Sequence, residues 1–144
     1  MVYYCADEPA LENQPCCRQV AYTPALEKNP ALYKSFERAL IKAYKFTQEN
    51  QVKTIKDVKK YIDINEEYIR TEVYGGFSTS HPDPDRLATI NVKDRAVDVG
   101  IYKDFDIESH INTEIYETAL NSILAESPDD PVYKSLKDHF DKYQ

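Results

Sequence analysis

Glycine is scarce in this 144-residue chain and tryptophan is absent: there are 3 Gly, no Trp, 1 Met and 3 Cys. Glycine is the residue that adopts the positive-φ backbone of tight turns at no steric cost. So few glycines argue against a β-barrel with many turns and against a glycine-lined phosphate loop. The nucleotide-binding patterns G-x-G-x-x-G and G-x-x-x-x-G-K-[ST] are also absent. The sequence therefore excludes the glycine-rich classes of nucleotide-binding protein.

Long apolar runs and an excess of basic charge are missing as well. No apolar run approaches the roughly 18–20 residues that a membrane span requires, so we expect no membrane insertion. The 18 basic and 25 acidic side chains give a formal net charge of -7, which repels polyanions, so nucleic acid is not an expected partner. The N-terminus shows no secretion signal, which predicts a cytoplasmic location if this is the whole gene product.

Length and composition predict a single domain over residues 1–144. A chain of this length with 42% hydrophobic residues can build one core without help from disulfides or metal. Three cysteines cannot all pair within one molecule, and Cys16 and Cys17 are adjacent, so no disulfide framework is predicted.

Helical patterns dominate the chain. Capping residues and apolar spacing predict about six helices, over residues 29–48, 54–63, 65–75, 84–102, 112–124 and from 131 onward. Asn65 is predicted to start the third of these helices and Asp130 to cap the last. Two β-like runs, residues 2–5 and 16–20, precede them. We therefore expect a mostly α (α+β) fold with one or two short N-terminal strands.

The helix over 29–48 carries the clearest amphipathic pattern. Its apolar stripe is predicted to face the core and consists of Leu32, Phe36, Ala39, Leu40, Ala43 and Tyr44. The side chains predicted to face water are Lys34, Glu37, Arg38, Lys42 and Lys45. The helix over 54–63 is expected to begin with a capping pair, Thr54 and Asp57.

No motif for catalysis is present, so an enzyme is not predicted. The patterns G-x-S-x-G and H-E-x-x-H are absent. His81, His110 and His139 are isolated along the chain and no C-x-x-C occurs, so neither a metal site nor a cofactor is expected. His81 is interpreted as an exposed loop histidine. Four acidic residues are interpreted as helix caps and solvated turns: Asp83, Asp85, Asp104 and Asp106.

Four stretches resemble one protein family: residues 15–20, 26–30, 36–50 and 97–106. In this order they resemble the part that follows the second hinge crossing in substrate-binding proteins of ABC importers. The branch is the nitrate, sulfonate, taurine and thiamine-precursor type, with a periplasmic-binding-protein fold. Complete members are much longer and have an N-terminal lobe, so the chain resembles their C-terminal part.

The resemblance implies a non-enzymatic module, an importer component or a truncated remnant, that binds a small solute, with an anion as a candidate. It also implies an extracytoplasmic location, periplasmic or at the cell surface, with an ABC permease or a missing N-terminal lobe as partner. The ligand would lie beside the hinge strand. Cys16, Cys17 and Arg18 are therefore the candidate ligand-binding residues, with the guanidinium of Arg18 gripping the anion.

Two other interpretations stay open. The first is a cytoplasmic helical protein–protein interaction module with exposed tyrosines on one face. The second is a thiol or metal-binding protein that uses Cys5, Cys16 and Cys17. Arg18 would then lower the pKa of the neighbouring thiols, although burial in a strand explains the cysteines as well.

Overall fold

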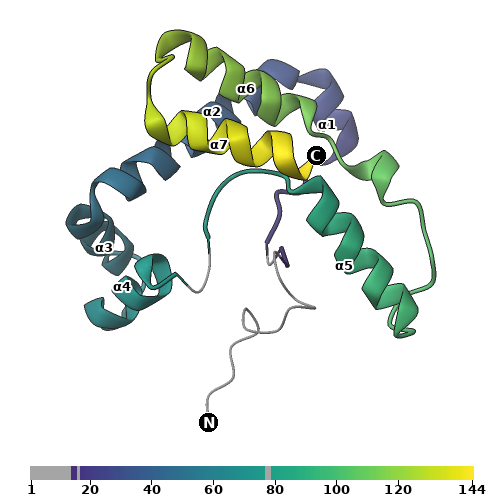
Figure 1. Ribbon diagram of the computed structural model, residues 1–144, viewed down its shortest axis with the longest axis horizontal. Helices are drawn as coiled ribbons and strands as arrows, with labels where there is room; N and C mark the ends of the chain where they lie inside the picture. Colours follow the sequence, from purple (N-terminus) through teal and green to yellow (C-terminus); the bar gives the residue numbers. More distant parts are fainter. Residues whose placement is uncertain (1–13, 16, 77–78) are drawn as a thin grey trace.

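The computed structural model describes residues 14–15, 17–76 and 79–144, and these residues are mostly helical (Figure 1). No strand occurs among them. The elements in chain order are α1 (Thr23–Lys28), α2 (Pro30–Glu49), α3 (Gln51–Lys59), α4 (Glu66–Tyr74), α5 (Arg86–Asp98), the 3-10 turn η3 (Glu108–His110), α6 (Glu114–Glu126) and α7 (Pro131–Tyr143).

The core lies where α2, α6 and α7 pack against one another. The sequence of α6 places Tyr116, Ala119, Leu120 and Ile123 on one helical face, and all four are buried. Each fully buried Leu or Ile contributes about 1.5–3 kcal/mol. The buried cluster consists of Ile41, Tyr116, Ala119, Leu120, Ile123, Tyr133, Leu136 and Phe140.

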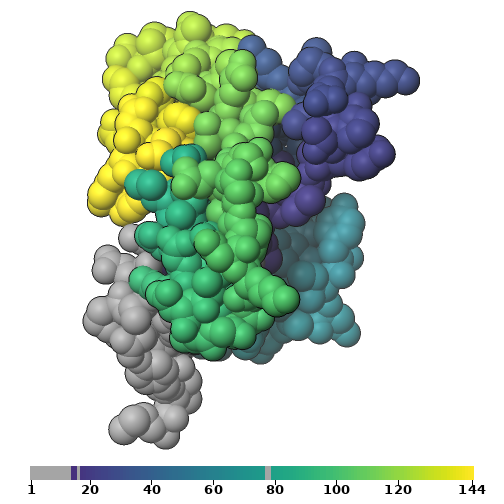
Figure 2. Space-filling model, turned by 90° about the vertical axis from the view of Figure 1, so that its right-hand side faces the viewer, coloured from purple at the N-terminus to yellow at the C-terminus, as the bar shows by residue number. Residues whose placement is uncertain are grey.

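The other helices lie around this core. α3 and α4 pack on each other and bury Ile55 and Ile69, and α5 contacts α7 (Figure 1). Figure 2 shows the face along which the chain runs from α5 through η3 to α6. The segment 79–85, which precedes α5, passes close to the end of α7 (Figure 1).

The mostly helical fold class is confirmed, and the six predicted helices correspond to α2 through α7. Asn65 and Asp130 cap α4 and α7 as the sequence predicts. The predicted start of α3 is wrong, because the helix begins at Gln51 and Thr54 is buried within it. α1 was not predicted, since six residues are too few to show a helical period.

The predicted strand over residues 16–20 is wrong in its described part. Residues 17–20 have no regular secondary structure. A strand is stable only when it pairs with another, and the described residues offer none. Cys16 and the predicted strand over residues 2–5 lie outside the described residues, and the single domain stays a prediction.

The face of α2 that packs inward differs from the predicted one. Of the predicted stripe, Leu32, Phe36, Ala39 and Ala43 are exposed, Leu40 is half-buried, and Tyr44 packs against the core. Ile41 and Glu37 are buried. The reason is tertiary packing: α6 and α7 cover the side of α2 that carries Ile41, and the helical period of α2 does not contain that information. Arg38 binds Glu126 of α6 at 2.7 Å, and Lys45 binds Asp130, which caps α7, at 2.8 Å. These ion pairs accompany the packing at the edge of the interface.

Candidate functional site

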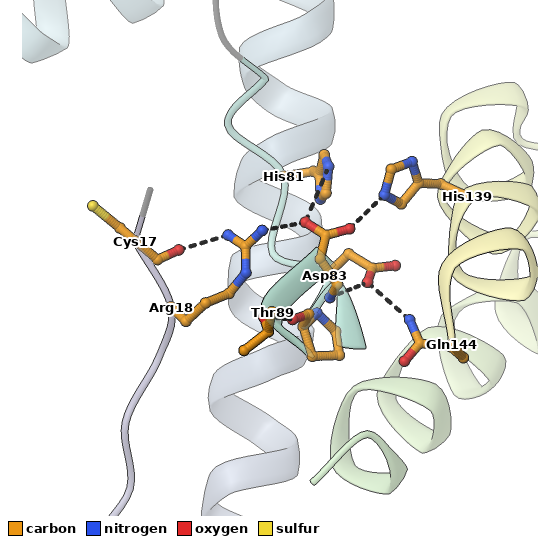
Figure 3. A network of polar contacts seen from close by, with 9 residues as sticks. Cys17, Arg18, His81, Asp83, Thr89, His139 and Gln144 are labelled. Carbon is orange, nitrogen blue, oxygen red and sulfur yellow. Dashed lines mark hydrogen bonds and ion pairs between the residues drawn. The ribbon is translucent and has the colours of Figure 1, made fainter. Parts of the chain in front are cut away.

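Three stretches far apart in the sequence meet at one cluster of polar side chains (Figure 3). The first precedes α1, the second is the segment 81–85 before α5, and the third is the end of α7. We call this cluster the polar junction and define it by Arg18, His81, Asp83, Asp85, His139 and Gln144.

The sequence His81-Pro-Asp-Pro-Asp85 shapes the middle stretch. Its two prolines restrict the backbone and cannot donate hydrogen bonds. The Asp83 carboxylate accepts a hydrogen bond from the backbone N–H of Asp85 at 2.8 Å, which makes a local Asx-type turn. Asp85 has φ 45, a left-handed conformation that Asp tolerates better than most residues. Asp85 precedes α5 without a side-chain cap bond, so its carboxylate is available for tertiary contacts.

Asp85 is the centre of the polar junction. Its Oδ2 forms an ion pair with Nη2 of Arg18, and its Oδ1 lies 2.7 Å from Nε2 of His139. Nε2 of His81 lies 3.9 Å from Oδ2. The buried Asp85 carboxylate therefore lies next to one guanidinium and two imidazoles. The guanidinium belongs to the stretch before α1, one imidazole to the loop before α5, and the other to α7.

The two histidine rings lie close together and are tilted by 58°. Their centroids are 4.3 Å apart, and the ring of His139 also lies 4.6 Å from that of Tyr143. Burial lowers the pKa of His81, and the charge of Asp85 opposes this only in part. A lowered pKa favours the neutral imidazole, in which one ring nitrogen keeps a lone pair.

Asp83 lies deeper than Asp85. Asp83 is only 1% exposed, and this burial raises the pKa of its carboxyl group. Besides the N–H of Asp85, it accepts a hydrogen bond from Nε2 of Gln144 at 3.1 Å. This bond ties the last residue of the chain to the loop.

Four buried polar atoms of the polar junction have no hydrogen-bond partner among the described residues. They are Nε of Arg18, Nδ1 of His81, Oδ2 of Asp83 and Oε1 of Gln144. Nearly all buried polar groups in folded proteins are paired, because an unpaired one costs about 1–3 kcal/mol. This group of unpaired atoms indicates a place where a ligand or water completes the hydrogen bonding.

The chemistry that the polar junction offers is that of metal ligands and proton carriers. His81, Asp85 and His139 each supply one ligand atom, and these atoms lie within 4.8 Å of one another. Two imidazoles and one carboxylate are a common ligand set for first-row transition metals. The six residues include no hydroxyl or thiol that could act as a nucleophile.

Of the sequence-predicted site residues, the structure places Arg18 in the polar junction. Its guanidinium contacts the Asp85 carboxylate and the Cys17 carbonyl oxygen, so the grip on an anionic solute stays a prediction. Cys17 is exposed beside it, and Cys16 lies outside the described residues.

Two interpretations of the loop are wrong. The His81 side chain is only 9% exposed, and Asp83 and Asp85 are buried rather than part of a solvated turn. Asp104 and Asp106 are exposed, as interpreted. The histidines are isolated in the sequence but not in space: His139 is 54 residues from Asp85 and reaches it only because of how α7 packs. The spacing H-x-x-x-D over residues 81–85 was the one local signal.

Two shallow grooves lie elsewhere on the surface. One, of about 450 Å³, is formed by α1, α2 and the start of α6, with Leu26, Pro30 and Ile115 among its lining. The other, of about 340 Å³, lies between α5 and residues 104–108. Both are wide open to solvent. No residue of either lining carries a buried polar atom that lacks a hydrogen-bond partner among the described residues, so the polar junction is the stronger candidate site.

Comparison with protein-family models, with curated proteins and with solved structures gives no significant match. The family resemblance stays a prediction. Among the helices of the described residues, none combines the length and the apolar character needed to cross a membrane.

Proposed function

We propose that the chain is a non-enzymatic binding protein that holds a small charged solute at the polar junction. The observation that carries this proposal is that four buried polar atoms of one cluster have no hydrogen-bond partner within the part of the chain that the structure describes. A bound solute with its water shell supplies the missing partners.

A purely structural role for the polar junction accounts for fewer of its features. The pairs that Asp85 forms with Arg18 and His139 do connect the three stretches. A cluster built only to connect them would be stabilised most by complete pairing, since partly satisfied buried networks are costly. Asp83 adds a second buried carboxyl without any cation at hydrogen-bond distance among the described contacts.

The family resemblance supports the same class of function. A solute-binding module of an ABC importer is non-enzymatic, lies outside the cytoplasm and works with a permease. We include these properties in the proposal. We place the solute at Arg18 and the loop over residues 81–85. Of the three predicted ligand-binding residues, Cys16, Cys17 and Arg18, this location retains Arg18.

The proposal is tested by solute titration of the full ¹⁵N-labelled chain. Backbone amide spectra are recorded with one solute at a time: nitrate, sulfate, taurine, acetate, calcium and zinc. We expect at least one solute to cause saturable shifts at residues 18, 81–85 and 139–144, and to lose this effect in Asp83→Asn with Asp85→Asn. The matched control, Asp104→Asn with Asp106→Asn, should respond like the wild type. Shifts that are absent for every solute, or confined to other regions, would contradict the proposal.

A further inference from the structure

We propose that the solute of the polar junction is a divalent transition-metal ion, bound by His81, Asp85 and His139. This inference rests on the proposed function and names the class of solute. Each residue supplies one ligand atom: a ring nitrogen of each histidine and a carboxylate oxygen of Asp85.

The distances between the ligand atoms fit a metal ion after a small adjustment. Zinc binds imidazole nitrogen at about 2.0–2.1 Å, so two ligands at a tetrahedral angle lie about 3.3 Å apart. The three ligand atoms here lie within 4.8 Å of one another, and His139 is already 2.7 Å from Asp85. The widest pair must approach by at most about 1.5 Å, which rotations of the His81 and His139 side chains can provide.

The charges of the polar junction favour a cation over an anion. Asp83 and Asp85 provide two buried carboxyl groups, and Arg18 provides one guanidinium that is already paired. The chain as a whole carries a formal charge of -7. An anion at this place would lie near one cation that is already paired and near two carboxyl groups. These contacts would not compensate for the hydration that the anion loses.

Two of the four unpaired atoms favour a hydrated cation. Oδ2 of Asp83 and Oε1 of Gln144 are acceptors that lack donors among the described residues. Nitrate and sulfate have no protons to donate to them. Three protein ligands leave at least one position on the metal for water, and metal-bound water donates hydrogen bonds to such acceptors.

Neighbouring contacts hold the ligands in place. Arg18 binds Oδ2 of Asp85 and leaves Oδ1 toward His139. Asp83 fixes the backbone of Asp85, and the ring of His139 rests on Tyr143. Such supporting contacts orient metal ligands and are worth about 10–100-fold in affinity.

The ligand types select the class of ion. Calcium and magnesium prefer six or more oxygen ligands, whereas imidazole suits zinc, copper, nickel and iron. Two imidazoles and one carboxylate therefore predict zinc binding well above calcium binding. Copper should bind more tightly than zinc, as the general order of divalent affinities requires.

The test is a zinc titration of the full chain in competition with a chromophoric chelator. We expect one zinc per chain for the wild type, and a loss of at least about 100-fold in affinity for His81→Ala and for His139→Ala, because each removes a ligand. His110→Ala is the matched control, since His110 is exposed in η3, and it should bind zinc like the wild type. A variant with Cys5, Cys16 and Cys17 all changed to Ser should do the same.

His139→Gln keeps a hydrogen-bonding side chain of similar size, so it is less prone to unfold than His139→Ala. Circular dichroism checks that each variant is folded. Equal zinc affinity in the wild type and in folded His139→Gln would overturn the inference, as would loss of zinc binding in the cysteine variant. If the polar junction responds to an anion or to calcium but does not bind zinc, the inference of a transition-metal site is overturned and the proposed function stays intact. No response to any solute overturns both.

Discussion

Asp85 shows how one residue can connect distant parts of a chain. A left-handed backbone and a neighbouring Asx-type turn direct its carboxylate away from the start of α5. Arg18 and His139 then bind its two oxygens from opposite ends of the sequence. The proposed metal site depends on this geometry.

Asp130 provides a residue-scale test of helix capping. Its carboxylate accepts hydrogen bonds from the N–H groups of Val132 and Tyr133, and it also binds Lys45. Asp130→Ala should lower the free energy of unfolding by about 1–2 kcal/mol, because a cap and a partly buried ion pair are both lost. Urea denaturation measures this loss. Asp129→Ala, the exposed neighbour, should stay within about 0.5 kcal/mol of the wild type, and equal losses in the two variants would contradict this assignment.

Glu37 provides a second test, through pH. Burial raises the pKa of its carboxyl to about 7, against the opposing hydrogen bond from Gln19. The folded state therefore holds a proton that the unfolded state releases, so stability is lost as pH rises from about 4.5 through about 7. Glu37→Gln removes this penalty. The difference in the free energy of unfolding, Glu37→Gln minus wild type, should rise by roughly 2 kcal/mol between about pH 5 and about pH 8. A difference that does not change with pH would show that Glu37 is solvated.

Residue roles followed from sequence where the cause was local. The caps Asn65 and Asp130 act on N–H groups two or three residues away, so the sequence alone predicted them. Burial of Glu37 and Asp83 depends on which helices pack over them, and no local pattern contains that information.

At the scale of elements, α2 is the instructive case. Its length and its start at Pro30 follow from the sequence, but its rotation does not. The sequence offers an apolar stripe through Leu32 and Phe36, whereas α6 and α7 cover the side that carries Ile41. The alternative of a protein–protein interaction module, which was based on exposed tyrosines on one face, stays a prediction.

A pair of substitutions on α2 tests its rotation. Ile41→Ala should lower the free energy of unfolding by about 2–5 kcal/mol, because Ile41 is fully buried against α6 and α7. Leu32→Ala on the exposed side should change it by about 0.5 kcal/mol or less. Denaturant unfolding of the two variants decides the matter. A larger loss for Leu32→Ala would mean that the stripe predicted from sequence faces the core.

Helix existence was predictable for α2 through α7 because each is long enough to show caps and a period. α1 has six residues and the stretch 17–20 has no partner strand, so neither could be placed by pattern. Of the residues that form the polar junction, Arg18 was the one predicted from the sequence as a site residue. His81 and His139 meet through tertiary packing across the segment 81–85 and α7.

At the scale of the whole molecule, the polar junction joins the chain before α1, the loop before α5 and the end of α7. An ion bound only by the folded state stabilises it by about 2.7 kcal/mol when its free concentration is 100 times Kd. Zinc at that concentration should raise the unfolding temperature of the wild type and of His110→Ala by roughly 5–10 °C. Differential scanning calorimetry measures the shift. The same rise in His139→Gln would place the zinc elsewhere.

The most direct test of the central claim is the imidazole ¹⁵N NMR spectrum of the full chain with and without one equivalent of zinc. Metal coordination changes the shift of the ligating ring nitrogen strongly, and the three histidines report separately. We expect the ring signals of His81 and His139 to shift together and to saturate at one zinc per chain, while the signals of exposed His110 stay unchanged. A shift of His110 alone, or of none of the three, would contradict it.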